Sequence, residues 1–154
     1  MINLTLSLSA IAALLPATLL PFRRTPDRDF IFWILLAVAA VGPALWIWVS
    51  FAPGWRTGLA ASLWVTVLAS LVLFAILSAM MRDAWRLAPL LFPYLIVISV
   101  FATVWLQQPE RPLQAEAPSA WIVFHIAVSL ATYVLLTIGA IAGLAVMLQE
   151  RALK

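Results

Sequence analysis

Long apolar runs alternate with short charged segments along the whole of this chain. The runs predict helices over about residues 2–22, 30–52, 58–80, 88–106 and 120–148. Apolar runs of about 20 residues bounded by charged loops are typical of membrane-spanning helices. The pattern therefore predicts an all-α, polytopic membrane helix bundle, with residues 1–154 forming a single transmembrane domain.

The composition narrows the class of protein. Hydrophobic residues make up 66% of the 154 residues and charged residues only 10%, with a mean hydropathy of +1.10. Soluble proteins carry about 25% charged residues, so a soluble enzyme is not expected. The net charge of +3 comes from single basic residues at helix ends, so nucleic-acid binding is not expected. The absence of cysteine excludes disulfides, thiolate metal sites and covalent haem attachment to this chain.

The positions of the basic residues predict the orientation. Seven of the nine fall on one side of the predicted bundle: Arg23, Arg24, Arg28, Arg82, Arg86, Arg151 and Lys154. The other side has only Arg56 and Arg111. Because basic loops stay on the cytoplasmic side, we expect the N-terminus outside and the C-terminus in the cytoplasm. The spans contain no Asp, Glu, Lys or Arg, which argues against an ion-driven transporter.

Tryptophans are concentrated towards the outer side of the predicted bundle. Six of the eight fall near outer helix ends: Trp46, Trp48, Trp55, Trp64, Trp105 and Trp121. Two interpretations are open. The rings form an ordinary interfacial aromatic belt, or some of them wall an apolar site for a flat cofactor.

The fifth run contains the only histidine, within the stretch "FHIAVSLATY". At about 100° per residue, one helix face collects polar and small side chains, with Tyr133 at its edge. These residues are His125, Ser129, Thr132, Leu136, Gly139 and Gly143. The spacing of the two glycines permits close helix packing. We therefore expect this face, and His125 with it, to point into the bundle or an outward-facing cavity and not at lipid.

His125 itself allows two interpretations. It is a neutral imidazole hydrogen-bonded across helices, for example with Ser129, or it is an axial ligand to haem iron. Trp121 precedes it by four residues, one helical turn closer to the outer surface. A single histidine supplies one axial position, so a second ligand must come from elsewhere.

The segment "PSAWIVFHIAVSLATYVLLTIGAIAGLAVMLQERALK" resembles the first histidine-bearing helix of the cytochrome c assembly family. The similarity is to its short branch of HemX-like and YpjD-like inner-membrane proteins, related to CcsA. The shared pattern is a histidine at the outer end, a serine four residues on, an aromatic residue another four on, then small residues and a Q-E-R-x-L-K end. It covers residues 118–154 and no other part of the chain.

The resemblance implies a multi-pass protein of the bacterial inner membrane that handles or presents haem near the outer face. His125 would bind the iron, and Ser129, Thr132, Tyr133 and Trp121 would line the cofactor. Other cytochrome c assembly proteins, or a missing C-terminal half, would be its partners. The sequence lacks the outer W-W-x-W-D motif of full-size members, and members of the short branch usually continue for several more spans.

A second hypothesis is a non-catalytic membrane scaffold or regulatory subunit whose fifth helix docks a partner through Gly139 and Gly143. A third, a small-solute transporter, lacks a polar path through the spans. Enzymatic activity is not expected, because the chain has no nucleophile–base pair, metal-ligand spacing or phosphate-binding loop.

Overall fold

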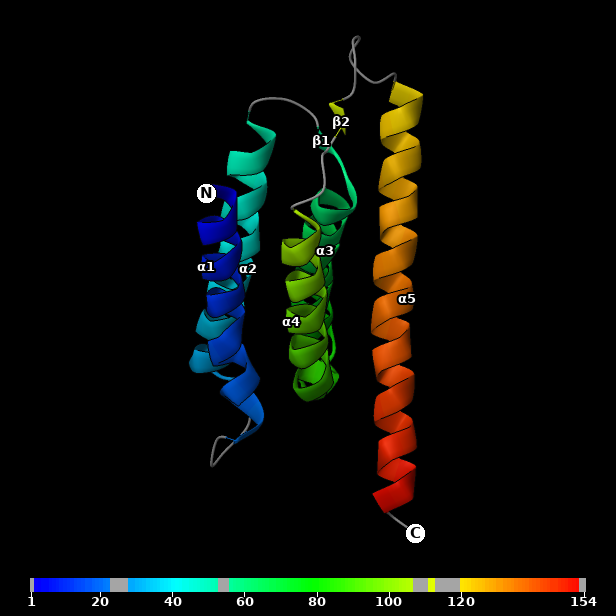
Figure 1. The fold of residues 1–154 in the computed structure, drawn as a ribbon. Coiled ribbons are helices and arrows are strands. Elements are labelled where there is room, and N and C mark those ends of the chain that lie inside the picture. Colours follow the sequence, from blue (N-terminus) through cyan, green and yellow to red (C-terminus); the bar gives the residue numbers. More distant parts are fainter. Residues whose placement is uncertain (1, 23–27, 53–55, 107–110, 113–119, 153–154) are drawn as a thin grey trace.

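The computed structural model describes residues 2–22, 28–52, 56–106, 111–112 and 120–152. In these ranges it contains five α-helices: α1 (Ile2–Leu14), α2 (Phe30–Phe51), α3 (Leu59–Met80), α4 (Ala88–Trp105) and α5 (Ala120–Ala152). Two 3₁₀ segments, η1 (Leu15–Phe22) and η2 (Ala84–Leu87), follow α1 and precede α4. The predicted all-α helix bundle is confirmed (Figure 1).

Four of the described helical segments are long and apolar enough to cross a membrane, judged by length and composition. They comprise α2, α3, η2 with α4, and α5, which fits a multi-pass membrane protein in a lipid environment. The first predicted span is shorter, because the α-helix ends at Leu14 and continues as a 3₁₀ segment. Pro16 lies at this change and has no N–H to donate to an α-helical carbonyl acceptor.

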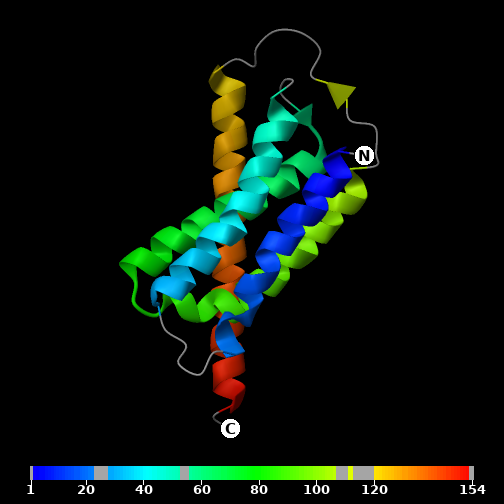
Figure 2. The ribbon, with the colours of Figure 1, turned by 90° about the vertical axis from the view of Figure 1, so that its left-hand side faces the viewer.

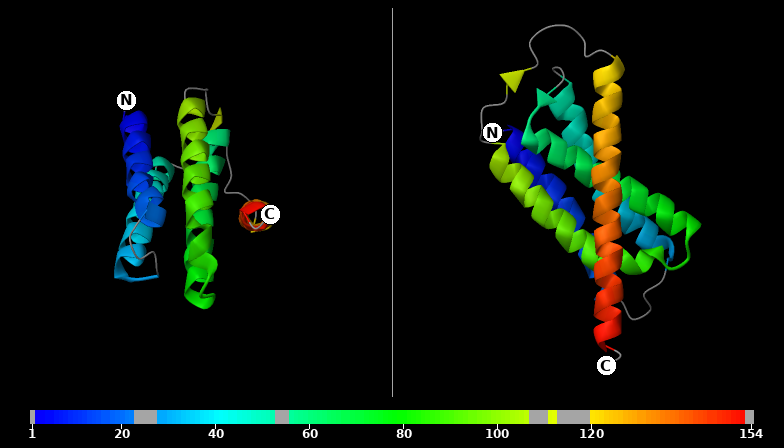
Figure 3. Two further views of the ribbon diagram at one scale, coloured as in Figure 1. Left: turned by 90° about the horizontal axis from the view of Figure 1, so that it is seen from below. Right: turned by 90° about the vertical axis from the view of Figure 1, so that its right-hand side faces the viewer.

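The helices stack in three layers. Seen from below, α1 with α2, then α3 with α4, and then α5 alone follow one another (Figure 3). The α5 helix packs mainly on α3, with fewer contacts to α4 and η2. Its neighbours tilt strongly relative to it, so α5 crosses the α3–α4 layer and does not run along it (Figure 2).

The two ends of the bundle are distinguished by a short β pairing. The strands β1 (Arg56–Thr57) and β2 (Arg111–Pro112) pair antiparallel, with Arg56 opposite Pro112. We call this the bridge end, and α5 begins there. The opposite end, where α5 finishes, is the tail end (Figure 1).

At the tail end, two adjacent side chains satisfy helix ends, Asp29 on α2 and Arg28 on α3. The Asp29 carboxylate caps α2 by accepting a hydrogen bond from the Phe32 N–H, over 3.0 Å. The Arg28 guanidinium donates to the carbonyl oxygens of Ser78 and Ala79, the latter over 3.2 Å. These carbonyls lie in the last turn of α3, where no helical N–H is available to them. Arg28 therefore satisfies a helix end that would otherwise expose bare carbonyl groups.

A glycine sets the distance between α1 and α2. A Cβ added at Gly42 would lie 2.9 Å from the Ala10 Cα and from the Ala13 Cβ. Real side chains do not tolerate such separations, so the two helices can approach this closely only at a glycine.

The core between α2, α3 and α4 is filled by three phenylalanine rings. The buried rings of Phe32, Phe74 and Phe92 meet edge to face there.

Replacing Gly42 by alanine should force α1 away from α2. We expect Gly42→Ala to lower the free energy of unfolding by about 1–3 kcal/mol, the usual cost of overpacking. The matched control is Gly139→Ala on α5, where an added Cβ would meet nothing within 4 Å. Thermal unfolding of the purified chain in detergent measures both. An equal loss in the two variants would contradict the close approach at Gly42.

Candidate functional site: the outward face of α5

The α5 helix has an apolar face that packs on the bundle. Among the α5 side chains that the structure describes, Val134, Ile138 and Ile141 are buried, with exposed fractions of 4%, 7% and 6%. Ile138 and Ile141 belong to the same core cluster as Leu71 and Phe74 of α3. These branched apolar side chains therefore fix which side of α5 is attached to the rest of the chain.

The polar and small residues of α5 lie on the opposite side. We call this the stripe face and define it by His125, Ser129, Thr132, Leu136, Gly139 and Gly143. Ser129 is half-buried and the other five are exposed. The prediction that these residues share a face agrees with the helix, but the prediction that the face points into the bundle is wrong. Helical periodicity identifies residues that lie together, whereas the fit of side chains against α3 decides which face packs.

The predicted helix packing at Gly139 and Gly143 is likewise not formed within the described residues. A Cβ built at either glycine would meet nothing within 4 Å. The small-residue surface is thus present on α5, but no helix of the described bundle uses it. In a membrane, the side of α5 on which Gly139 and Gly143 would let another helix approach most closely is therefore uncovered by the described bundle.

The proposed cofactor residues do not surround a common cavity. Trp121 and Phe124 stack with their ring centroids 5.9 Å apart, and His125 follows directly on the same exposed end of α5. The Thr132 hydroxyl donates to the Val128 carbonyl over 2.9 Å, so its proton is already used. Tyr133 lies elsewhere, lining a groove between α3, α4 and α5. This chain alone therefore offers one imidazole and one stacked aromatic pair on an open surface.

No group of three or more His, Asp or Glu side chains gathers into a metal site in the part of the chain that the structure describes. His125 is consequently the donor to consider for iron. It fits one axial position of a haem, and the sequence holds no second histidine for the opposite position.

Two of the outer tryptophans have a structural role that sequence reasoning missed. Trp46 and Trp64 are fully buried and stack with centroids 5.3 Å apart. The Trp46 indole N–H donates to the buried Ser7 hydroxyl over 2.8 Å. These two rings contact one another inside the bundle, so they form neither an aromatic belt nor the wall of an open site. The signal available in the sequence was the hydroxyl side chains within the apolar run of α1, of which Ser7 is one.

Other tryptophans keep the expected surface position. Trp48, Trp105 and Trp121 are 79%, 45% and 74% exposed. Trp55, together with the basic residues Arg23, Arg24 and Lys154 used for the orientation, lies outside the described residues.

Comparison with known proteins gives one informative relative. A curated protein of Azospirillum brasilense, described as "Uncharacterized 28.8 kDa protein in nifR3-like 5'region", is 46% identical over 157 residues. The match covers 99% of this chain but 58% of that relative, so the chain spans little more than half its length. No protein-family model and no solved structure matches the chain. In that relative, the region similar to this chain occurs within a longer protein, whose description names no activity.

The Ser7–Trp46 hydrogen bond should be a measurable stabilising contact. We expect Ser7→Ala and Trp46→Phe each to lower the free energy of unfolding by about 1–3 kcal/mol. Ser7→Ala leaves the buried Trp46 N–H without its acceptor, and Trp46→Phe removes the donor of the same hydrogen bond. The double variant should cost less than the sum of the single variants, since both remove the same bond. Thermal unfolding in detergent measures this coupling. Strict additivity of the two losses would show that the contact contributes nothing.

Proposed function

We propose that this chain is the haem-handling part of an inner-membrane protein of cytochrome c assembly, with His125 as one axial ligand of the haem. The rest of the site would come from membrane helices that dock on the stripe face of α5. The observation that carries the proposal is the outward position of the chain's only imidazole, on the side of α5 opposite its own bundle.

The chemistry of the stripe face supports docking. A side facing only lipid has no reason to collect a histidine, two hydroxyl side chains and two glycines, because polar groups in hydrocarbon lack hydrogen-bond partners. Membrane helices associate through small residues that let backbones approach and through polar groups that bond across the contact. The stripe face holds both kinds of group, with the glycines open for contact.

The occupant that we propose is the remainder of the longer protein in which this region occurs. This chain leaves 42% of the length of the Azospirillum relative unmatched. Helices in that remainder would be held at high effective concentration by the covalent connection, so a modest contact would suffice. They would bring the second axial ligand and close the apolar pocket.

The proposed location of the haem follows from the placement of His125. His125 is five residues from the start of α5 at the bridge end, about 8 Å along the helix axis. With the basic residues in the cytoplasm, this end faces the outer surface. Trp121 and Phe124 would contact the porphyrin from the adjacent turn, while Ser129 and Thr132 would lie one and two turns deeper. Haem supplies the iron and the vinyl groups that react with apocytochrome thiols, and this chain positions it.

A non-catalytic scaffold is the second candidate, favoured by the deeper half of the same face. Gly139 and Gly143 lie far from His125 and form a contact surface that does not require a cofactor. In this alternative the same helices dock, but His125 only hydrogen-bonds across the contact.

The haem-handling function and the scaffold function can be distinguished in the complete natural protein, purified after expression with added haem. If haem is handled, the protein carries a Soret band that His125→Ala removes or shifts, while Leu135→Ala leaves it unchanged. Leu135 is exposed on α5 but lies off the stripe face, which makes it the matched control. A folded protein without a Soret band, even after haem reconstitution, would exclude the haem function.

The docking role has its own readout. Gly139→Leu and Gly143→Leu should separate α5 from the docked helices and lower the thermal midpoint of the complete protein. The same substitutions should leave this chain alone nearly unchanged, because the side chains enter open space there. Equal effects in the complete protein and in the isolated chain would contradict docking on this face.

A further inference from the structure

The α5 helix is the longest of the described helices. Its 33 residues make it about 50 Å long, whereas α2 and α3 have 22 residues each and are about 33 Å long. With α5 drawn upright, it extends past α3 and α4 at the tail end (Figure 1). The hydrocarbon core of a bilayer is about 30 Å thick. Helices α2 and α3 match this thickness when they stand nearly upright, and α5 exceeds it.

The extra length of α5 is apolar. Residues 121–148 include no Asp, Glu, Lys or Arg, and the charged residues Glu150 and Arg151 follow them. This stretch measures about 42 Å along the helix axis, roughly 12 Å more than the hydrocarbon core. An upright α5 would therefore expose apolar turns to water. A tilt of about 45° reduces the depth of the same stretch to about 30 Å.

Charged side chains mark the tail ends of the shorter helices. Arg28 and Asp29 precede α2, and Arg82 and Asp83 follow α3. Because α2 and α3 have little apolar length to spare, a strong tilt of these two helices would draw the charges into hydrocarbon, where ionised groups are costly. The charged ends therefore favour an upright position for α2 and α3.

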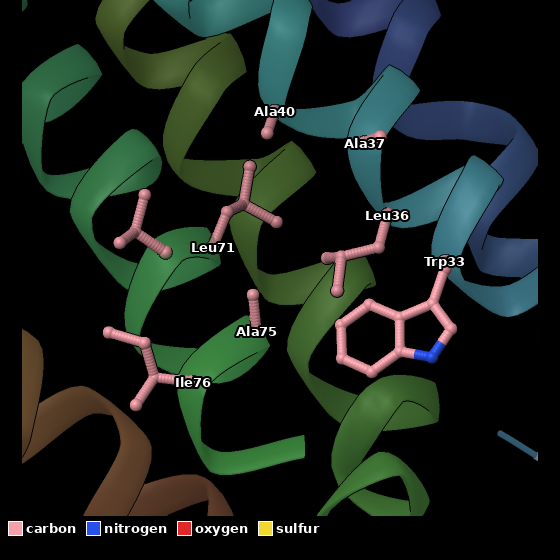
Figure 4. A pocket seen from close by; sticks show the side chains of 8 residues that line it. Trp33, Leu36, Ala37, Ala40, Leu71, Ala75 and Ile76 are labelled. Atoms are coloured by element: carbon pink, nitrogen blue, oxygen red, sulfur yellow. The ribbon is translucent and has the colours of Figure 1, made fainter. Parts of the chain in front are cut away.

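The surface between α2 and α3 remains apolar close to the tail end. A groove of about 260 Å³ there is lined by aliphatic side chains and Trp33 (Figure 4). Its lining residues Val72 and Ile76 are 48% and 49% exposed, so the groove faces outward. Trp33 lies three residues after the first residue of α2, about 5 Å along the axis. The surface suited to hydrocarbon thus takes up nearly the whole length of α2, as an upright helix requires.

The packing of the bundle supplies the tilt of α5. Helices α1 to α4, which we call the base, tilt in one sense relative to α5 in two opposite views (Figure 2 and the right-hand view of Figure 3). The buried side chains Val134, Ile138 and Ile141 attach the central part of α5 to the base. Beside this contact, a groove of about 530 Å³ stays open between α3, α4 and α5, with Tyr94 and Tyr133 in its lining. An upright base therefore requires an oblique α5.

We propose that the base stands nearly upright in the bilayer and that α5 crosses the bilayer obliquely, at about 45° to the membrane normal. The surplus apolar length of α5 and its crossing of the base both require this tilt. Trp121 then lies at the interface of the bridge end and Glu150 at the interface of the tail end, each in its preferred environment. The proposal holds whether or not haem binds to His125.

The oblique position moves the bridge end of α5 sideways from the base. His125 lies 13 residues from Ile138, about 20 Å along the helix axis. At a tilt of about 45°, roughly 14 Å of this distance runs parallel to the membrane plane. The surface around His125 therefore lies beside the base, where its neighbours are lipids and other membrane helices.

The test compares two positions that are equally far from the middle of their helices. Val146→Cys on α5 lies 11 residues from the central Leu135, and Ala52→Cys after α2 lies 11 residues from the central Val41. All four of these native side chains are exposed. Eleven residues measure about 17 Å along a helix axis. On an upright α2, position 52 reaches the interface, whereas on an oblique α5 position 146 lies about 12 Å from the bilayer centre, inside the hydrocarbon.

Each cysteine carries a nitroxide spin label in nanodiscs of the complete protein, in which any cysteine outside this chain is replaced by alanine. The ratio of collision rates with oxygen and with a water-soluble nickel chelate measures the depth of the label. We expect the label at position 52 to lie about 5 Å further from the bilayer centre than the label at position 146. Labels at positions 41 and 135 should both lie near the centre.

Circular dichroism and the thermal midpoint establish that each labelled variant is folded, and Met147→Cys, also at an exposed residue, provides a second position on α5. Equal distances from the bilayer centre at positions 52 and 146 would mean that α5 stands as upright as α2, and would overturn the proposal. A greater distance at position 146 would overturn it as well, because the base would then be oblique and α5 upright.

Discussion

The packing of Val134, Ile138 and Ile141 on the α3–α4 layer is the contact on which the functional account depends. It attaches α5 by an aliphatic face and leaves the opposite face, with the histidine and both glycines, outside the bundle. Inside a membrane the packing of small residues and the pairing of polar groups drive helix association, since lipid tails are as apolar as leucine. An outward face of this composition is suited to another helix more than to lipid.

The other layers hold together by contacts that do not involve α5. Gly42 lets α1 approach α2, the Ser7–Trp46 bond and the Trp46–Trp64 stack fill the bridge-end core, and Arg28 ties α2 to the last turn of α3. The Ser7 hydroxyl is used in these contacts, whereas Ser50, Ser70, Ser78 and the Trp64 indole N–H are buried without a hydrogen-bond partner in the described part of the chain. Helices α1 to α4 thus form a base, and α5 presents its free face from that base.

The sequence predicted the helices well and the site poorly, for physical reasons. Apolar runs report where a chain crosses hydrocarbon, so the fold class and most helix limits follow from hydropathy alone. The 3₁₀ segment after Leu14 shows where a proline changed the outcome. The periodicity of α5 correctly grouped His125 with Gly143, but it carries no information about which face meets α3. The groove with Tyr94 and Tyr133 combines three helices, and no local pattern predicts such a combination.

Whether the stripe face is covered in the membrane is the most direct question, and oxygen accessibility of spin labels answers it. The chain has no cysteine of its own, so a single introduced cysteine gives a single labelling position in this chain. Thr132→Cys places the label on the stripe face, and Leu135→Cys places it on α5 outside the stripe face. In nanodiscs of the complete protein, we expect low oxygen collision rates at position 132 and high, lipid-like rates at position 135. High rates at both positions would mean that the stripe face meets lipid, and would contradict the account.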